Sequence, residues 1–204
     1  LVRVGIVNPN QMTFLRAEAQ TMTTFPQFLT DVLRTGSTVT LQANNDITIS
    51  SPIIVPGGAG GAFTLQAGGS MVINADINTA NGNLTLIANE TLANGVVDAF
   101  RPAGNAVMSV APNVTITVGS GDLLMDLGAG ADKTNFGSGD LTLGNNVLIQ
   151  STSGDILMKS VNSIIAAGSG TIQTGSGTLT MVVDNLYPIP PGVGFGIFNI
   201  PQVN

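Results

Sequence analysis

The sequence predicts an all-β protein built as a parallel β-helix, in which short strands stack coil upon coil. Three observations predict this fold class: an unusual composition, short strands that recur at a near-constant spacing, and a turn that returns in the same form. Only 9% of the 204 residues are charged and 4% are aromatic, while 43% are hydrophobic. An ordinary soluble domain has about 25% charged residues, and disordered chains combine low hydrophobicity with high net charge. The composition therefore excludes a disordered chain and disfavours a helical bundle.

The residue types that the chain lacks exclude several kinds of chemistry. It contains no His and no Cys, has only six basic residues, and carries a formal net charge of −6. Ser-His-Asp and Cys-His sites, zinc fingers and disulfides are therefore excluded. Binding to nucleic acid needs clustered Lys and Arg. We expect no enzyme activity, no catalytic residue, no cofactor, no metal and no nucleic-acid partner.

The N-terminal region, residues 1–36, is expected to end in a short helix between Thr23 and Gly36. Thr24 can cap this helix, Pro26 is tolerated in its first turn, and Gly36 ends it. Its apolar stripe consists of Phe28, Leu29, Val32 and Leu33. An uncovered first coil would expose strand edges and core, so we expect the helix to shield that coil.

The strands that follow, over residues 37–184, share an apolar–polar–apolar pattern. We take eight positions as equivalent, and they lie on average 20 residues apart: Leu41, Leu65, Leu86, Met108, Met125, Leu143, Met158 and Met181. Most units carry a second alternating run, such as Ile47-Thr48-Ile49. Units of this length predict a solenoid of about eight coils, roughly 40 Å long at the usual strand spacing. The crossover preference of parallel strands favours a right-handed coil.

The alternation within a strand assigns side chains to faces. In Val39-Thr40-Leu41 the apolar pair points inward and Thr40 outward, because successive strand residues face opposite ways. We therefore expect a line of buried leucines along one face of the rod: Leu41, Leu65, Leu86 and Leu143. Asparagine tolerates the left-handed backbone conformation of tight corners. The expected corner asparagines are Asn44, Asn45, Asn145 and Asn146.

A recurring turn separates a solenoid from a β-sandwich, which also has alternating strands at regular spacing. A Gly-Asp pair precedes an apolar pair at Asp122, Asp140 and Asp155. Stacked coils place equivalent turns above one another, so we expect these three aspartates to form a ladder of solvated turn residues. The alternative for such a ladder is carbohydrate cleavage, which needs paired carboxylates or a neighbouring base. No Lys or Arg accompanies all three aspartates, and Lys159 is the only base close to them in the sequence, so solvated turn residues are favoured.

Three further motifs have weaker functional readings. Leu127–Asn135 partly matches a calcium-binding β-roll repeat, but there is one imperfect copy, so a polar glycine-rich corner is favoured. Thr pairs at alternate positions occur in three of the expected coils: Thr38 with Thr40, Thr115 with Thr117, and Thr178 with Thr180. An ice-binding face needs such a pair in nearly every coil, so these threonines are expected to be ordinary outward residues of half-buried strands. Acceptor sequons for N-glycosylation begin at Asn83, Asn89 and Asn113.

Two segments resemble a known family. The stretch Phe28–Ile53, which contains Leu41-Gln-Ala-Asn-Asn-Asp-Ile-Thr-Ile49, is similar to the rungs of filamentous-haemagglutinin-like secreted proteins, and so is Gly82-Asn-Leu-Thr-Leu-Ile-Ala-Asn89. The resemblance is strongest over 28–89 and extends more weakly to about residue 183. It implies a right-handed parallel β-helix on the bacterial surface or in the medium, as an adhesin or a toxin-carrying stalk. A secretion-recognition domain and a toxin module are not seen at the ends of this sequence.

Two functions follow as hypotheses. The first is an adhesin-like structural rod on the bacterial surface or outside the cell, which contacts a host or neighbouring surface through loops such as Asn94–Gly104. The alternative is a filament or sheath subunit in which the end coil of one copy stacks on the next. The Pro/Gly-rich tail, residues 185–204, is uncharged and is expected to mediate such self-association through four side chains: Tyr187, Phe195, Ile197 and Phe198. No segment has the run of apolar residues that a membrane span needs.

Overall fold

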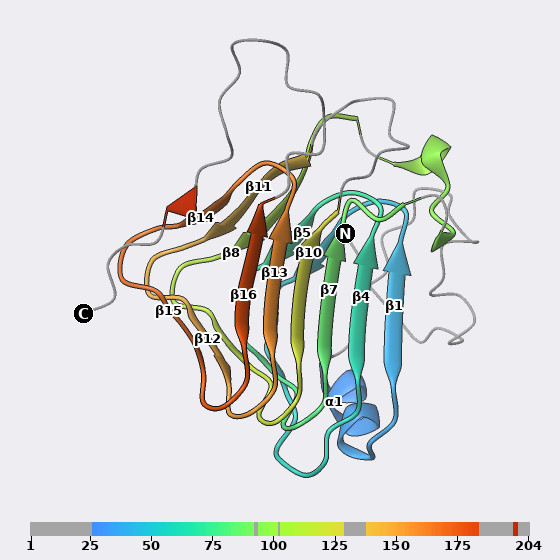
Figure 1. Cartoon of the computed structure of the whole chain (residues 1–204). Coiled ribbons are helices and arrows are strands. Elements are labelled where there is room, and N and C mark those ends of the chain that lie inside the picture. Colours follow the sequence, from blue (N-terminus) through green and yellow to red (C-terminus); the bar gives the residue numbers. More distant parts are fainter. Residues whose placement is uncertain (1–25, 92–93, 102, 129–137, 184–197, 200–204) are drawn as a thin grey trace.

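The computed structural model describes residues 26–91, 94–101, 103–128, 138–183 and 198–199, and it confirms the predicted fold class. All strand pairs are parallel and form three sheets of six, six and five strands. In each sheet, neighbouring strands are three elements apart in the chain order, so every circuit of the chain adds one strand to each sheet. Figure 1 shows the first of these sheets, with its strands side by side from β1 to β16. This arrangement is a three-sided parallel solenoid.

The strands are as follows. The first sheet contains β1 (Val39–Ala43), β4 (Phe63–Ala67), β7 (Leu84–Ala88), β10 (Leu123–Leu127), β13 (Ile156–Ser160) and β16 (Leu179–Val183). The second contains β2 (Ile47–Ile49), β5 (Met71–Ile73), β8 (Ala106–Val110), β11 (Ser138–Leu143), β14 (Ile164–Ala166) and β17 (Phe198–Asn199). The third contains β3 (Ile53–Ile54), β6 (Ile77–Asn78), β9 (Thr115–Thr117), β12 (Leu148–Ser151) and β15 (Thr171–Thr174).

The described residues form six coils, the last without a strand in the third sheet, and not the eight that the mean spacing predicts. Met108 and Leu143 were assigned to the first sheet, but both lie in the second, where Leu143 pairs with Val110. Leu86 is followed in its own sheet by Met125. The error arises because strands of all three sheets alternate apolar and polar residues in the same way, so the pattern does not show to which sheet a strand belongs. The third and fourth coils are also longer than the mean, since they carry the segments 89–105 and 128–137 between their first two strands.

Inward side chains of the first sheet form a ladder, as the alternation predicts. Leu41, Leu65 and Leu86 pair in register and are 6%, 1% and 0% exposed, and Met125 and Met158 continue the line. Leu143 is also buried but belongs to the ladder of the second sheet. Full burial of an aliphatic side chain contributes about 1.5–3 kcal/mol, so this ladder adds substantially to the apolar core, which inward side chains of all three sheets build.

Helix α1 (Pro26–Arg34) covers the first coil, as expected from the sequence. Leu29 and Leu33 are buried against the end of the solenoid, and the carbonyl of Leu33 accepts a hydrogen bond from the backbone N–H of Gly61 at 2.8 Å. One member of the predicted stripe was wrong: Phe28 is 59% exposed. A single short helix buries only the residues that face the coil. The proposed cap, Thr24, lies outside the described residues.

The opposite end of the rod is more open. Leu179 of β16 is 40% exposed, whereas its register partner Ile156 in the preceding coil is fully buried. In the described part of the chain, β16 has a paired neighbour on one side only, so its inward face is partly uncovered. Of the four tail residues expected to mediate association, three lie outside the described residues. Phe198 lies in β17, whose backbone pairs with β14 of the same chain.

Candidate functional site

A ladder of glycines forms the corner between the third and first sheets. It consists of Gly61, Gly82, Gly121, Gly154 and Gly177, and we call it the glycine corner. A Cβ atom on Gly154 would lie 2.1 Å from the carbonyl oxygen of Gly121, and one on Gly177 would lie 2.1 Å from that of Gly154. Neighbouring coils therefore approach one another more closely here than any residue with a side chain allows.

Asparagine and aspartate side chains join the coils beside the glycine corner. The backbone N–H of Asp122 donates to Oδ1 of Asn83 at 3.0 Å, and that of Asp155 donates to Oδ1 of Asp122 at 2.9 Å. The N–H of Thr178 continues the series with a bond of 2.7 Å to Oδ1 of Asp155. The side-chain oxygens of one asparagine and two aspartates thus accept hydrogen bonds from corner amides that the sheets leave unpaired.

The predicted stack of three aspartates was wrong in one member. Asp122 and Asp155 stack, but Asp140 lies in β11 of the second sheet and accepts a hydrogen bond from Nδ2 of Asn162 at 2.7 Å. The Gly-Asp dipeptide occurs there inside a strand, because Gly139 and Asp140 belong to β11 itself. The same two residue types therefore serve as a corner in two places and as part of a strand in a third.

Sequence reasoning missed the hydroxyl groups that support the glycine corner. Oγ of Ser151 accepts the N–H of Gly154 at 2.8 Å, and Oγ1 of Thr174 accepts that of Gly177 at 3.1 Å. Thr79 makes the related bond from Oγ1 to the carbonyl of Gly82. Each hydroxyl precedes its glycine by three residues, so a Ser or Thr three positions before Gly is the signal that identifies this corner.

Asparagines occupy another corner, between the second and third sheets. Asn113 and Asn146 adopt the left-handed conformation, with φ of 63° and 58°, and Nδ2 of Asn146 donates to Oδ1 of Asn113 at 3.2 Å. The prediction of a left-handed corner residue was therefore right for Asn146. Asn44, Asn45 and Asn145 are not left-handed. Asn44 is instead buried, and its Oδ1 accepts the N–H of Val97 at 2.7 Å.

That contact belongs to a polar network beneath the longest described connection, residues 89–105, which we call the insertion. The side chain of Arg101 is only 1% exposed; it donates to the carbonyl of Gly68 at 2.9 Å, to Oδ1 of Asn89, and to Asp98 at 3.4 Å. A buried guanidinium is tolerated because several acceptors surround it. The insertion is thus fixed to the rod by buried side chains.

Glu90 anchors the start of the insertion. Its carboxylate is buried and accepts hydrogen bonds from the N–H of Thr91 and from Nδ2 of Asn94, both at 2.8 Å. Gln66 donates to the same carboxylate at 3.1 Å and in turn accepts from Gln42 at 2.7 Å. This chain of bonds connects the insertion to the outer face of the first two coils. The insertion therefore has a defined position from which it presents Phe100, which is 40% exposed.

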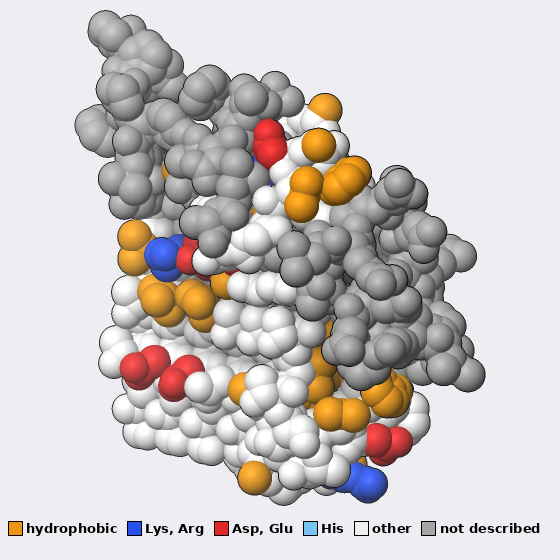
Figure 2. All heavy atoms as spheres, turned by 90° about the vertical axis from the view of Figure 1, so that its right-hand side faces the viewer, with side chains coloured by type: hydrophobic (Ala, Val, Ile, Leu, Met, Phe, Trp, Pro, Cys, Tyr) orange, Lys and Arg blue, Asp and Glu red, His pale blue; other side chains and the backbone are white. Residues whose placement is uncertain are grey.

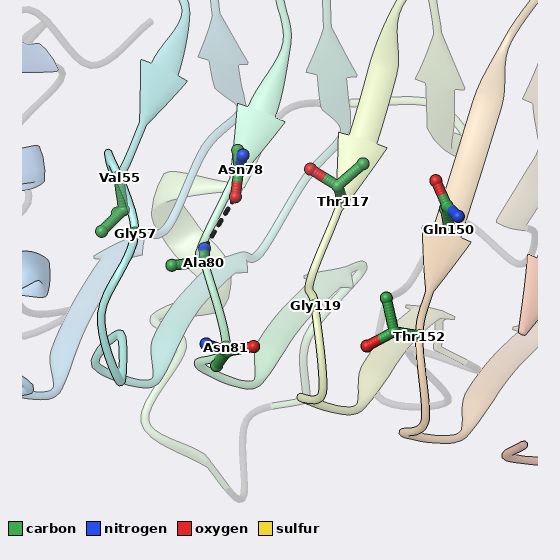
Figure 3. Close-up of a pocket in the computed structure, with 9 residues that line it drawn as sticks. All are labelled: Val55, Gly57, Asn78, Ala80, Asn81, Thr117, Gly119, Gln150 and Thr152. Carbon is green, nitrogen blue, oxygen red and sulfur yellow. Dashed lines mark hydrogen bonds between the residues drawn. The ribbon is translucent and has the colours of Figure 1, made fainter. Parts of the chain in front are cut away.

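A shallow groove of about 260 Å³ lies at the ends of the third-sheet strands, where the chain turns toward the glycine corner (Figure 3). Its lining is free of charged residues and comes from the first four coils: Val55, Gly57, Asn78, Ala80, Asn81, Thr117, Gly119, Gln150 and Thr152. Asn78, Thr117 and Gln150 are register partners on successive strands and face outward. Strand stacking alone thus brings these three polar side chains into one row.

The other predicted motifs are not brought together. Thr40 and Thr180 lie in the strands at opposite ends of the first sheet, while Thr115 and Thr117 lie in the third, so the pairs do not share one face. Single threonines do align on the first three coils, at Thr40, Thr64 and Thr85, but Leu124 ends this row in the fourth. In the glycine-rich stretch considered for calcium, Leu127 is buried in β10 and residues 129–135 lie outside the described residues. Of the three sequon asparagines, Asn89 is buried and donates to the carbonyl of Gly128 at 2.9 Å.

Neither a metal cluster nor a membrane-spanning helix is seen in the part of the chain that the structure describes. No group of three or more acidic, His or Cys side chains there is placed to hold a metal ion, and no helix there is long and apolar enough to cross a membrane. No protein-family model matches the chain, and no curated protein or solved structure matches it either. The reading of function therefore depends on the geometry of the rod and its surface.

Proposed function

We propose that the chain is a non-enzymatic structural rod of a bacterial surface or secreted protein and serves as an adhesin-like stalk. The outer faces support a role in contact with solvent: charged side chains are few on the face in Figure 2, where backbone and uncharged polar atoms predominate. The inner faces supply stiffness, because one continuous apolar core runs through the coils. A closely packed core of this kind resists deformation.

The difference between the two ends is the observation that favours a stalk over a stacking filament. Helix α1 covers the first coil with Leu29 and Leu33, so the final coil of another copy has no open coil on which to stack. Among the described strands, β16 is paired on one side only, which supports the alternative, a filament or sheath subunit, because an unpaired strand edge is a template for another strand. Head-to-tail growth, however, needs both ends to be open.

The insertion is the part of the stalk proposed to make the adhesive contact. Binding residues are commonly carried on loops that a rigid scaffold positions. The buried bonds of Arg101 and Glu90 hold this loop in place, and Phe100 and Val107 are exposed on or beside it. Exposed apolar side chains on a fixed loop, and on the strand that follows it, provide contact groups for a host or neighbouring cell.

Light scattering on the full chain separates the stalk from the filament. We expect a monomer of 20.7 kDa at all concentrations up to about 1 mM, a range that detects association of ordinary weak affinity. Antibodies against the folded chain are expected to label intact cells of the source bacterium without permeabilisation. Filaments that grow with concentration, and that Met181→Lys in β16 abolishes, would establish the alternative; labelling only after permeabilisation would contradict both functions.

A further inference from the structure

The third-sheet groove has free hydrogen-bonding groups, unlike the comparable ladders elsewhere on the rod. On the first sheet, Gln42 donates to Gln66 at 2.7 Å, and Lys159 pairs with Asp126 at the same distance. In the groove, the side chains of Thr117, Gln150 and Thr152 make no hydrogen bond to another described residue. Side chains that extend from neighbouring strands without pairing are available to a ligand.

The groove also has a fixed shape. Val55 is buried beneath it, and Ala80 forms part of its wall in a left-handed conformation with φ of 60°. That conformation is unfavourable for alanine by roughly 1–2 kcal/mol, and the bond from the N–H of Ala80 to Oδ1 of Asn78, at 2.7 Å, helps to hold it (Figure 3). Asn81 is fixed as well, because it donates to the carbonyl of Gly58 at 2.7 Å and accepts from the N–H of Ser120 at 3.1 Å. Backbone strain of this kind is concentrated at functional sites.

The chemistry of the lining selects an uncharged ligand rich in hydroxyl groups. Amides and hydroxyls both donate and accept, which suits a polyol, whereas an anion or a cation would find no opposite charge among the lining residues. The row of Asn78, Thr117 and Gln150 repeats at the strand spacing of about 4.8 Å along the rod. From the first coil to the fourth, the lining spans about 14 Å, which is the length of a short oligosaccharide.

We propose that this groove binds a neutral carbohydrate chain lying along the rod axis. The proposal rests on the proposed surface function, because a surface rod meets neutral glycans on other cells. Thr117 and Gln150 supply hydrogen bonds to successive sugars, and Asn78 donates through its amide nitrogen while its oxygen holds Ala80. The lining contains no aromatic side chain on which a sugar could stack. The affinity of one groove is therefore weak, with a Kd of about 1 mM, and many rods on one surface would add avidity.

The test is an NMR titration of the full chain with three neutral trisaccharides: maltotriose, cellotriose and triacetylchitotriose. We expect at least one of them, at about ten times the 1 mM Kd, to shift the side-chain amide signals of Asn78 and Gln150. The Gln150→Ala variant is expected to bind that sugar about fivefold more weakly or worse, as the loss of one neutral hydrogen bond predicts. Gln173→Ala is the matched control, since Gln173 is the register partner of Gln150 in β15 but does not line the groove. Its affinity should be unchanged.

Two outcomes would overturn the carbohydrate site. One is that no neutral trisaccharide shifts the groove signals, or that trigalacturonate, an anionic trisaccharide, shifts them more strongly. The other is that Gln173→Ala weakens binding as much as Gln150→Ala does. Neither outcome would contradict the stalk function, because that function is tested separately by light scattering and by antibody labelling of intact cells. The antibodies could fail to label intact cells while the purified protein still binds a neutral trisaccharide. That result would contradict the stalk function and leave the groove as a carbohydrate-binding site.

Discussion

Replacing Leu86 by aspartate is expected to unfold the rod or to destabilise it by more than about 4 kcal/mol, because a buried carboxylate without a partner is among the costliest single changes. Leu86 is fully buried in β7, between Leu65 and Met125 of the adjoining coils. The rod has no alternative place for this side chain, since a strand residue cannot reach the opposite face without a shift of register. Urea unfolding followed by circular dichroism at 218 nm, the usual strand wavelength, measures the change.

Thr85→Asp is the matched control for this prediction. Thr85 is the neighbour of Leu86 in β7, and it faces outward and is half-buried. The same carboxylate at this position stays in contact with water, so we expect a change within about 1 kcal/mol. Equal losses in the two variants would mean that the alternation of faces in β7 is not as described.

Replacing Gly154 by alanine is expected to destabilise the rod by about 2–4 kcal/mol, although only one methyl group is added. The new Cβ would lie 2.1 Å from the carbonyl oxygen and 2.4 Å from the carbonyl carbon of Gly121. Both atoms belong to backbone, so relief requires that two coils move apart at the corner. That movement would also lengthen the bond from Asp155 to Asp122, now 2.9 Å. Thermal unfolding of the purified variant measures the loss.

Gly170→Ala is the comparison that isolates the close approach of the coils. Gly170 is exposed, and a Cβ there would have its nearest contact at 3.2 Å from the carbonyl oxygen of Val147. A small shift relieves that contact, so a change below about 1 kcal/mol is expected. If Gly154→Ala is tolerated equally well, the glycine corner does not require glycine, and the tight stacking inferred for it is wrong.

The fold was predictable from the sequence because the alternation of apolar and polar residues is visible within each strand. Alternation in Phe63-Thr-Leu65 and Leu84-Thr-Leu86 shows which residues face inward, and the structure buries both leucines. The N-terminal helix was equally predictable, since proline and glycine mark its ends. These features depend on neighbours in the chain, which a single sequence displays.

The number of coils was not predictable, because register depends on contacts between distant residues. A two-residue period shows that a side chain faces the core but not which sheet it belongs to, so Met108 of the second sheet resembles Met125 of the first. The insertion hides the true spacing, since β7 and β10 pair Leu84 with Leu123 across 39 residues.

The groove could not be predicted for the same reason. Its central row joins Asn78 to Thr117 and Thr117 to Gln150, across 39 and 33 residues that share no visible repeat. The corner was partly predictable, because Gly-Asp recurs at Asp122 and Asp155. The Gly-Asp pair inside β11 has the same sequence but a different environment. A Cβ on Gly139 would lie nearest to the side chain of Val107, at 2.6 Å, whereas a Cβ on Gly154 would meet the backbone of Gly121. This contact between distant residues distinguishes the corner from the strand, and the sequence does not display it.

Disulfide trapping tests the six-coil register most directly, since every feature above depends on it. The chain has no cysteine, so an engineered pair reports only its own distance. Thr85 and Leu124 are register partners on adjacent strands, where strands lie about 4.8 Å apart, within the range that a disulfide spans. The account predicts that Thr85→Cys with Leu124→Cys forms an intramolecular disulfide under mild oxidation, while Thr85→Cys with Val107→Cys does not. A disulfide between positions 85 and 107, with none between 85 and 124, would contradict it, because that is the pairing of an eight-coil solenoid.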